Sequence, residues 1–260
     1  MPIPKNTAQI IDYYSLYTAA FQNSEREMPL IRDEYTQKFG TAPQRLREDF
    51  CGTCANGIEW IKFGDQYRAI GIDVDEPVIK LAQAKSNSVL SSEETDRLTL
   101  IHGNVLELQL PTADIIAALN CSFCYFWKRQ EFKEYLEKCF ATISNCGMIA
   151  LEIYCGADAY NLGCDEIPLE GVTAIWEQAK FDPITNRCLN FIHFRLDDGE
   201  LIERAFVYDF RLWSPAECID LLHEVGFTQI KTVDLNEMHG NESQLIDSSI
   251  TLFILGFKNG

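Results

Sequence analysis

The feature that most constrains this sequence is a regular alternation, beginning at Gln44, of short apolar runs with segments of helical periodicity. Strands are predicted at residues 46–50, 67–74, 98–104, 113–119 and 147–154, and helices at residues 54–64, 75–85 and 128–143. Strands that alternate with helices at this spacing form βαβ units, whose parallel strands share one sheet with helices on both faces. The expected fold class is therefore α/β, with a mostly parallel sheet.

Two regions interrupt this alternation. Near the N-terminus, residues 7–22 and 29–39 have helical spacing that stops at Gly40, which predicts N-terminal helices. Residues 172–182 and 186–213 instead have the pattern of antiparallel strands, with the sequence DDGE as a hairpin turn. We therefore expect helices and a β insertion laid over the α/β core.

After residue 213 the sequence returns to the first pattern. Ser214 caps a helix that begins at Pro215 and ends at Gly226, and strands follow at residues 227–234 and 250–257. We expect one domain over residues 1–260. Its parts are an N-terminal helical lid at 1–40, an α/β core at 41–155 and 214–260, and an antiparallel β insertion at 156–213 over the substrate site.

The composition disfavours several classes of partner. The formal net charge of -17 argues against nucleic acid, because affinity for phosphate backbones rests on Lys and Arg. The longest apolar runs are too short to span a bilayer, and the first residues lack a signal-peptide pattern, so we expect a cytoplasmic protein with no membrane partner. Ten cysteines in such a chain indicate free thiols. The sequence is compatible with a homodimer.

The stretch EDFCGTCANG contains a C-x-x-C pair at Cys51 and Cys54, and CSFC adds a second pair at Cys121 and Cys124. Zinc sites and redox couples use such pairs. However, 66 residues separate Cys54 from Cys121, far more than in a compact zinc ribbon, and the surrounding order is not thioredoxin-like. We therefore favour small side chains in tight turns and assign no metal. A zinc or thiol-redox protein stays an alternative.

The expected site lies at the carboxyl ends of the parallel strands, where open α/β sheets bind their ligands. Gly52 allows a close backbone approach to a ligand, and the helix that follows offers unpaired amides to a negative group. Asp73 ends the next strand 21 residues later, the spacing at which an acidic residue meets the ribose hydroxyls of a nucleoside. A nicotinamide-dependent oxidoreductase shares this logic, but its G-x-G-x-x-G motif is absent.

In chain order, EDFCGTC, AIGIDVD, LIHGNVLEL, ADIIAALNCSF, CGMIALEIY and WSPAECIDLLHEVGF resemble the motifs of class I S-adenosylmethionine-dependent methyltransferases, from about Arg45 to Phe257. LREDFCGT and WEQAKFDPITNR are similar to a bacterial subgroup of that family. Arg26, 22 residues before Glu48, gives a looser resemblance to glycine N-methyltransferase-like enzymes. The resemblance implies a Rossmann-like sheet with an antiparallel last strand, S-adenosylmethionine as cofactor and S-adenosylhomocysteine as product.

The resemblance also implies cofactor-binding roles. Glu48 is the acid of the first motif, and Cys51 and Gly52 form its turn. For the nucleoside, Asp73 binds both ribose hydroxyls, Val74 packs on adenine, and Asn104 binds the adenine amino group beside the Val105 amide. For the methionine part, Arg26 holds the carboxylate, and Asn120 and Cys121 line the site. Phe50 and Cys54 stand where the family has glycines, which predicts a bulkier turn. Asn104 replaces the usual Asp, so an acceptor is kept and a charge is lost.

Candidate substrate residues are aromatic or titratable side chains expected near the pocket: Tyr13, Tyr17, Phe123, Trp127, Trp176 and His193. An aromatic face suits the positive sulfonium, and His193 is a candidate base, while ordinary packing is the alternative for each of them. Methyl transfer mainly needs alignment in a dry pocket, with a base only when the nucleophile arrives protonated. No catalytic residue is therefore assigned.

The leading hypothesis is a methyltransferase that transfers a methyl group in line to a small-molecule acceptor, either an amine, a hydroxyl or a carboxylate. An enclosed pocket and an acidic surface favour such an acceptor over RNA. A methyltransferase-like fold without activity is a further alternative, because Phe50, Cys54 and Asn104 depart from the family pattern.

Overall fold

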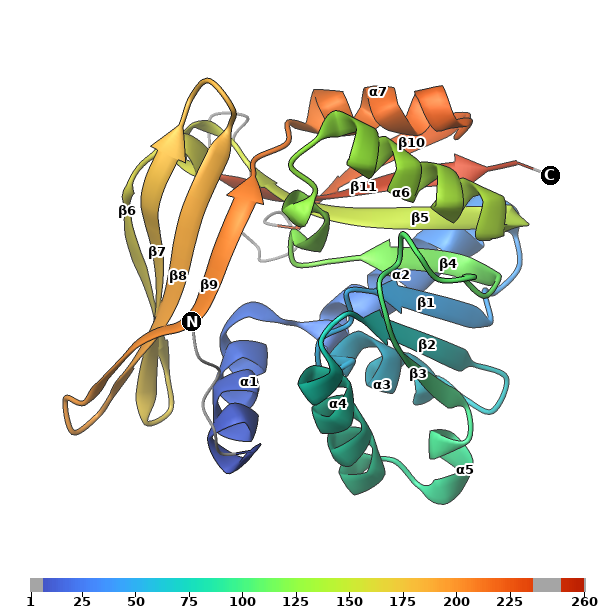
Figure 1. The fold of residues 1–260 in the computed structure, drawn as a ribbon. Coiled ribbons are helices and arrows are strands. Elements are labelled where there is room, and N and C mark those ends of the chain that lie inside the picture. The colour runs from blue at the N-terminus through green and yellow to red at the C-terminus, as the bar shows by residue number, and fades with distance from the viewer. Residues whose placement is uncertain (1–6, 236–248, 260) are drawn as a thin grey trace.

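The computed structural model describes residues 7–235 and 249–259, whose arrangement is drawn in Figure 1. The helices are α1 (Thr7–Phe21), α2 (Ser24–Phe39), α3 (Ala55–Ile61), α4 (Glu76–Val89), α5 (Ser92–Thr95), α6 (Arg129–Thr142) and α7 (Pro215–Val225), with short 3-10 helices η1 (Ser122–Tyr125) and η2 (Ala157–Tyr160). The strands are β1 (Arg45–Asp49), β2 (Arg68–Asp73), β3 (Leu98–His102), β4 (Ala113–Ala118), β5 (Ile143–Cys155), β6 (Gly163–Leu169), β7 (Val172–Asp182), β8 (Arg187–Leu196), β9 (Leu201–Arg211), β10 (Gln229–Asp234) and β11 (Ile250–Lys258).

Seven strands of the described residues form one sheet in the order β10-β11-β5-β4-β1-β2-β3, named the main sheet below. Strands β1 to β5 pair in parallel, whereas β11 is antiparallel to both β5 and β10. The strand order reverses between β1 and β4, so the carboxyl ends of these two neighbours border the crevice in which α/β sheets bind ligands. This topology confirms the expected α/β class and the antiparallel last strand.

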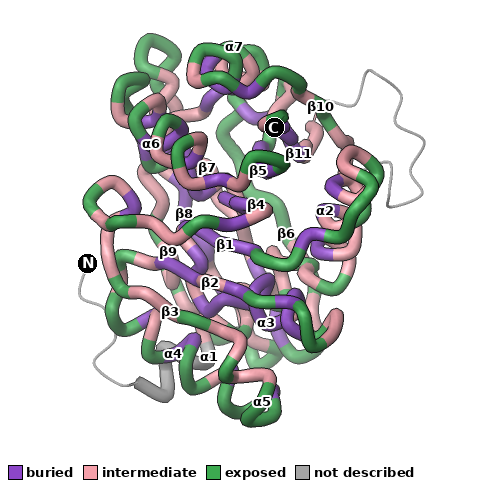
Figure 2. Tube along the Cα trace, turned by 90° about the vertical axis from the view of Figure 1, so that its right-hand side faces the viewer, coloured by how far each residue is buried: buried purple, intermediate pink, exposed green. Residues whose placement is uncertain are grey.

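Helices cover both faces of the main sheet. On one face α2 and α3 pack over a cluster that includes Leu46 and Ile115, and on the other face α6 and α7 pack over a cluster that includes Ile116. Successive strand residues point to opposite faces, which is why the neighbours Ile115 and Ile116 belong to different clusters. Figure 2 shows the resulting buried path along β1, β2 and β4 through the middle of the molecule.

Four described strands, in the order β6-β7-β8-β9, form a separate antiparallel sheet, named the insertion sheet. The DDGE turn joins β8 to β9, as expected, with Gly199 at φ 91°. This sheet stands beside the main sheet near α1 (Figure 1), and α1 packs on it through Leu16, Tyr17 and Phe21. The N-terminal helix and the insertion therefore share one hydrophobic contact. The role of residues 1–40 as a lid stays a prediction.

The ends of several elements follow local rules. Ser214 and Glu217 form a capping box at the start of α7, and Gly226 ends this helix in the left-handed conformation, both as predicted. Helix α2 differs from the prediction, because it begins at Ser24 and contains Pro29. Pro29 lies beyond the first turn, so its ring nitrogen cannot donate the helical hydrogen bond to the Glu25 carbonyl, and α2 continues past this proline with one such bond missing. Within the described residues, no helix has the length and apolar character that a membrane crossing needs.

Candidate functional site

The turn after β1 has an unusual backbone. Phe50, Gly52 and Cys54 have φ angles of 61°, 54° and 56°, so all three adopt the left-handed conformation that favours glycine. For a side chain other than glycine this conformation costs on the order of 1 kcal/mol or more. The Cys51 amide, which donates to the Ile72 carbonyl at 2.9 Å, ties this turn to the end of β2. The turn thus keeps the backbone shape of a glycine-rich turn with only one glycine.

The side chains of Phe50 and Cys54 are taken up by core packing. The Phe50 ring packs against the rings of Phe126 and Tyr135, with centroids 5.8 and 5.6 Å away. Cys54 is fully buried in a small cluster with Cys51. The sequence predicted a bulkier turn at these two positions. In the structure the added bulk lies in the core beside the turn.

Asp73 joins two loops at the carboxyl edge of the main sheet. Its Oδ2 accepts the Gly52 amide at 2.8 Å, and its Oδ1 accepts the Asp75 amide at 3.0 Å. Burial raises the pKa of Asp73, while these amide hydrogen bonds oppose the rise. Burial, together with the nearby charges of Asp75 and Asp73, also raises the pKa of Tyr14 on α1. The predicted ribose-binding residue therefore lies where the turn, the β2 end and α1 meet.

The adjacent residues at β1 have a structural role that the sequence did not reveal. Arg47 donates through Nε and Nη2 to both carboxylate oxygens of Asp49, at 2.9 and 3.1 Å, and both side chains are fully buried. The Tyr135 hydroxyl on α6 also donates to Asp49 at 3.0 Å. Because residues alternate across a strand, this ion pair lies on the α6 face and leaves Glu48 on the α3 face.

The residues predicted to meet adenine lie at the ends of β2 and β3. Val74 is 65% exposed, whereas Val105 is buried. The Asn104 side chain is engaged locally, since its Oδ1 accepts the Leu106 amide at 3.0 Å and its Nδ2 donates to Glu107 at 3.2 Å. Asn104 therefore caps the turn after β3, and its contact with adenine stays a prediction.

Buried carboxylates converge on the ends of β1 and β5. Glu48 accepts hydrogen bonds from the Asn56 side chain at 2.8 Å and from the Gly57 amide at 3.2 Å. Glu152 on β5 accepts the Asn120 amide at 2.8 Å, and Glu27 lies on α2. None of the ion pairs between described residues involves Glu27, Glu48 or Glu152. These are carboxylates without a cationic partner among the pairs that the structure describes.

The protonation of these carboxyl groups reflects their burial. Burial raises the pKa of Glu48 and of Glu27 to about 7, and it raises the pKa of Glu152 well above its ordinary value. The charge of Glu27 adds to the rise of the pKa at both Glu48 and Glu152, so Glu27 lies within electrostatic reach of each of them. A cation bound among them would stabilise the charged forms and lower these pKa values.

Several buried polar atoms around these carboxylates have no hydrogen-bond partner among the residues that the structure describes. Four belong to the junction of α1 and α2, and two lie at the starts of α3 and η1: Thr18 Oγ1, Gln22 Oε1, Ser24 Oγ, Glu27 Oε2, Asn56 Oδ1 and Ser122 Oγ. Buried polar atoms are rarely left unpaired, because desolvation without a compensating bond is costly. Such a concentration fits a polar ligand with both donors and acceptors. Arg26, predicted to hold a carboxylate, precedes Glu27 on α2.

A cavity of about 560 Å³ opens beside these groups, at the carboxyl ends of β4 and β5. It lies between those strand ends, α1 and the insertion sheet. Its lining includes Asn120, Cys121, Glu152, Tyr17, Phe21, Trp176, Tyr208, Phe210, Asp158 and Asp165. Asn120 and Cys121 have positive φ angles of 51° and 54°, which turn the chain sharply at this edge. The cavity has the size of a small-molecule site.

The cavity separates the predicted substrate residues into two groups. Tyr17 and Trp176 line it, and Trp176 stacks on Tyr208 with centroids 5.8 Å apart. Tyr13 and Phe123 are not part of the described lining, and Phe123 is fully buried in the core. Trp127 also lies elsewhere, beneath the Arg187 guanidinium at 3.7 Å. The structure therefore does not bring these last three to the cavity.

His193 lies on the wrong face of the insertion sheet for the cavity. In the antiparallel pairing of β7 with β8, His193 is opposite Ile175, whereas Trp176 is opposite Ile192. Paired residues share a face, so His193 and Trp176 point to opposite sides of the sheet. His193 Nε2 contacts Glu177 at 2.9 Å, and its Nδ1 accepts the Arg204 amide. The structure thus favours a packing role for His193 over a role as a base in the cavity.

The sequence prediction missed three residues that the structure places at the site. These are Glu27 on α2, Glu152 on β5 and Tyr208 on β9. Glu152 could have been identified from the sequence, because it is the only charged residue in the apolar run MIALEIY. Burying a carboxylate in such a strand is costly unless it binds a partner or takes part in function. The other two depend on how α2 and the insertion meet the main sheet, which no local pattern reports.

The two C-x-x-C pairs carry free thiols, as do all the cysteines of the chain. A hydrogen bond from Cys124 lowers the pKa of the Cys121 thiol, while the hydrogen bond between Cys51 and Cys54 raises that of Cys51. In the part of the chain that the structure describes, no three His, Cys, Asp or Glu side chains group as a metal site would require. The pairs are therefore read as parts of two turns.

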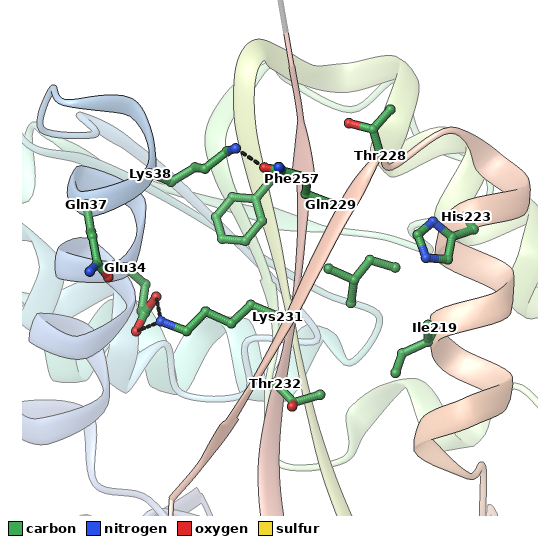
Figure 3. A pocket seen from close by; sticks show the side chains of 11 residues that line it. Glu34, Gln37, Lys38, Ile219, His223, Thr228, Gln229, Lys231, Thr232 and Phe257 are labelled. Carbon is green, nitrogen blue, oxygen red and sulfur yellow. Dashed lines mark hydrogen bonds and ion pairs between the residues drawn. The ribbon is translucent and has the colours of Figure 1, made fainter.

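A larger hollow, of about 820 Å³, lies at the other edge of the main sheet between α2 and α7 (Figure 3). Its charged groups already have partners, since Lys231 contacts both carboxylate oxygens of Glu34 at 2.7 Å, and Lys38 contacts Gln229. It contains none of the predicted site residues. We therefore take the smaller cavity as the candidate site.

No protein-family model matches the sequence, and no curated protein matches it either. Solved structures do match. An S-adenosylmethionine-dependent methyltransferase from Clostridium acetobutylicum, 15% identical, has a TM-score of 0.74 over 98% of this chain and 100% of that one. An amino pentose methyltransferase from Micromonospora echinaspora, bound to S-adenosylmethionine, is 15% identical with a TM-score of 0.66 over 95% and 96%. A sugar N-methyltransferase from a Streptoalloteichus species is 14% identical, with a TM-score of 0.66 over 95% and 93%.

The chain has the fold of these methyltransferases. At such identities the likeness establishes a Rossmann-like sheet with an extra antiparallel sheet, as the sequence predicted. The finer resemblances, to the bacterial subgroup and to glycine N-methyltransferase-like enzymes, stay predictions.

Proposed function

We propose that this protein is an S-adenosylmethionine-dependent methyltransferase that acts on a small-molecule acceptor. The observation that carries the proposal is the turn after β1, whose backbone is left-handed at Phe50, Gly52 and Cys54 and whose Gly52 amide binds Asp73. A left-handed backbone at the non-glycine residues Phe50 and Cys54 lowers stability. We therefore infer that this backbone conformation serves the function of the protein. The methyltransferase neighbours, one of them bound to S-adenosylmethionine, support the same conclusion.

The residues present fit this cofactor. Asp73 would accept the ribose hydroxyls, and the exposed Val74 would pack on adenine. The unpaired polar atoms at the α1–α2 junction, with Glu27, would hold the ammonium group of the methionine part, and Arg26 its carboxylate. When bound, S-adenosylmethionine supplies an electrophilic methyl group on a sulfonium. The chain's own residues position the acceptor, and the aromatic walls of the cavity keep water away from it.

Calorimetry with S-adenosylhomocysteine tests the proposal. Wild-type protein should bind it, and Asp73→Asn should weaken binding by at least about tenfold, because a hydrogen bond to a charged group is worth about 1.5 to 3 kcal/mol. Asp75→Asn is a matched control, since Asp75 contributes its backbone amide to Asp73. Its affinity should stay close to that of the wild type. Absence of binding by the wild type would favour the alternative of a methyltransferase fold without cofactor.

A further inference from the structure

The residues that line the cavity at the carboxyl ends of β4 and β5, named the acceptor cavity below, favour one chemical class of methyl acceptor. Resting on the proposed methyltransferase function, we propose that the cavity binds an acceptor that carries a protonated amine, and that Glu152 receives the proton that this amine must lose before methylation. The inference narrows the acceptor from the three classes that the sequence left open to one.

The charge of the lining is the first support. Glu152, Asp158 and Asp165 are acidic, and the described residues that line the cavity include no Lys, Arg or His. An anionic acceptor such as a carboxylate or phosphate would enter against like charges, with no cation to bind it. A neutral hydroxyl can donate a hydrogen bond to one of these carboxylates, but it lacks the attraction between opposite charges. A cationic amine is attracted by all of them.

The aromatic walls are the second support. Rings of Tyr17, Phe21, Trp176, Tyr208 and Phe210 surround the cavity. They form a continuous chain, since Trp176 lies 6.2 Å from Phe21 and 5.8 Å from Tyr208, and Tyr208 lies 5.0 Å from Phe210 between ring centroids. Ring faces attract ammonium groups, and the attraction grows when water is excluded. Rings combined with carboxylates are a recurrent means of binding cationic amines in proteins.

Glu152 is placed to take part in the chemistry as well as in binding. It is 8% exposed, lines the cavity, and receives the Asn120 amide on Oε2. Asn120 and Cys121 follow β4, the strand end expected beside the methionine part of the cofactor. The glutamate thus lies between the acceptor cavity and the expected position of the transferable methyl group.

An ammonium nitrogen has no free electron pair, so the amine must be deprotonated before it can attack. One N–H bond of the ammonium breaks, its electron pair stays on nitrogen, and the proton forms an O–H bond with the Glu152 carboxylate. This yields a neutral amine and a neutral carboxylic acid. Burial raises the pKa of Glu152, which brings it closer to that of an amine and makes this transfer less unfavourable.

The test uses 2-phenylethylamine and 2-phenylethanol, probes of the same shape that differ in the amine. Calorimetry is carried out on the full chain saturated with S-adenosylhomocysteine. We expect the amine to bind at least about tenfold more tightly than the alcohol. Glu152→Gln, likewise saturated with S-adenosylhomocysteine, should lose most of this preference. Glu166→Gln, on β6 and paired with Arg195 outside the cavity lining, should keep the wild-type preference.

Trp176→Leu provides an independent variant should Glu152→Gln fail to fold, because Trp176 is only partly buried on the insertion sheet and leucine keeps an apolar side chain there. It should reduce the preference for the amine by about threefold or more. If the wild type binds S-adenosylhomocysteine but binds amine and alcohol equally, the amine inference fails and the proposed function stands. If it binds no S-adenosylhomocysteine, the proposed function itself fails.

Discussion

The two C-x-x-C turns, one after β1 and one after β4, invite a direct comparison. They follow neighbouring strands, both have left-handed residues other than glycine, and each lies beside a buried glutamate: Glu48 at the first turn and Glu152 at the second. Yet Cys51 and Cys54 are closed off behind their turn, while Cys121 lines the cavity. The same spacing of two thiols thus serves packing at one strand end and a pocket wall at the other.

The difference in thiol exposure comes from the elements that pack against each turn. Helix α3 begins at Ala55, directly after the first pair, and covers its thiols. The second pair overlaps η1, within which Cys124 is buried, whereas Cys121 lies just before η1 and faces the cavity that the insertion sheet borders. The spacing C-x-x-C therefore specifies the turn, and the neighbouring elements specify whether the thiols are accessible.

The largest expected effect is on thiol reactivity. In native protein treated with iodoacetamide, Cys121 should be alkylated roughly 1,000-fold faster than Cys51 or Cys54, because the buried pair reacts only after local opening. Peptide mapping by mass spectrometry measures each site, with the exposed Cys146 and Cys164 as internal references. Similar rates at the two turns would remove the contrast between them.

The next effect concerns the glutamate of the first turn. Burial raises the pKa of Glu48 from 4.5 to about 7, so the folded state binds its proton more tightly than the unfolded state does. The free energy of unfolding should therefore fall as pH rises from about 4.5 to 7. Glu48→Gln removes this contribution, on the order of 3 kcal/mol. Urea unfolding of both proteins between pH 4.5 and 8 measures it.

The matched control for this comparison is Glu93→Gln, at an exposed position of α5. It should keep the wild-type dependence on pH. If the free energy of unfolding of Glu48→Gln depends on pH in the same way as that of the wild type, Glu48 is ionised in the folded state without loss of stability. The surroundings of the first turn would then be more polar than we describe.

The smallest effect tests how tightly the first pair is packed. A methyl group at Gly71 would lie 2.7 Å from Cys54 Sγ and 2.9 Å from Cys51 Sγ. Gly71→Ala should lower the free energy of unfolding by about 1 to 3 kcal/mol, the usual range for overpacking. Gly163→Ala, where nothing lies within 4 Å, should change it little. Denaturant unfolding measures both, and equal stabilities would mean that the thiols have room to move.

Much of the fold was predictable because its elements carry local signals. The alternation of apolar runs and helices gave the main sheet, and Ser214, Pro215 and Gly226 bounded α7 to the residue. Strand β6 was missed because most of its residues are exposed and show no alternation. Helix α5 is a single turn held by its own capping box, too short for a periodic pattern.

The site was less predictable than the fold. It depends on which face of a strand each residue occupies and on contacts between residues that are far apart in the sequence. Asp73 could be placed because a strand end and a fixed spacing mark it. His193 and Trp176 could not be distinguished, since a change of one residue in register reverses which of them faces the cavity. Glu27 acts through the packing of α2 near distant strands, which sequence periodicity does not encode.

The buried ion pair on β1 bears on how this chain can change over evolutionary time. Arg47 and Asp49 satisfy each other in the core, with Tyr135 as a third partner. Replacing either charge alone would strand the other and cost about 3 to 5 kcal/mol, whereas replacing both by apolar residues of similar volume is often neutral. Substitutions at these two positions should therefore be accepted together or not at all, so the pair is expected to change as one unit within the strand that leads to the left-handed turn.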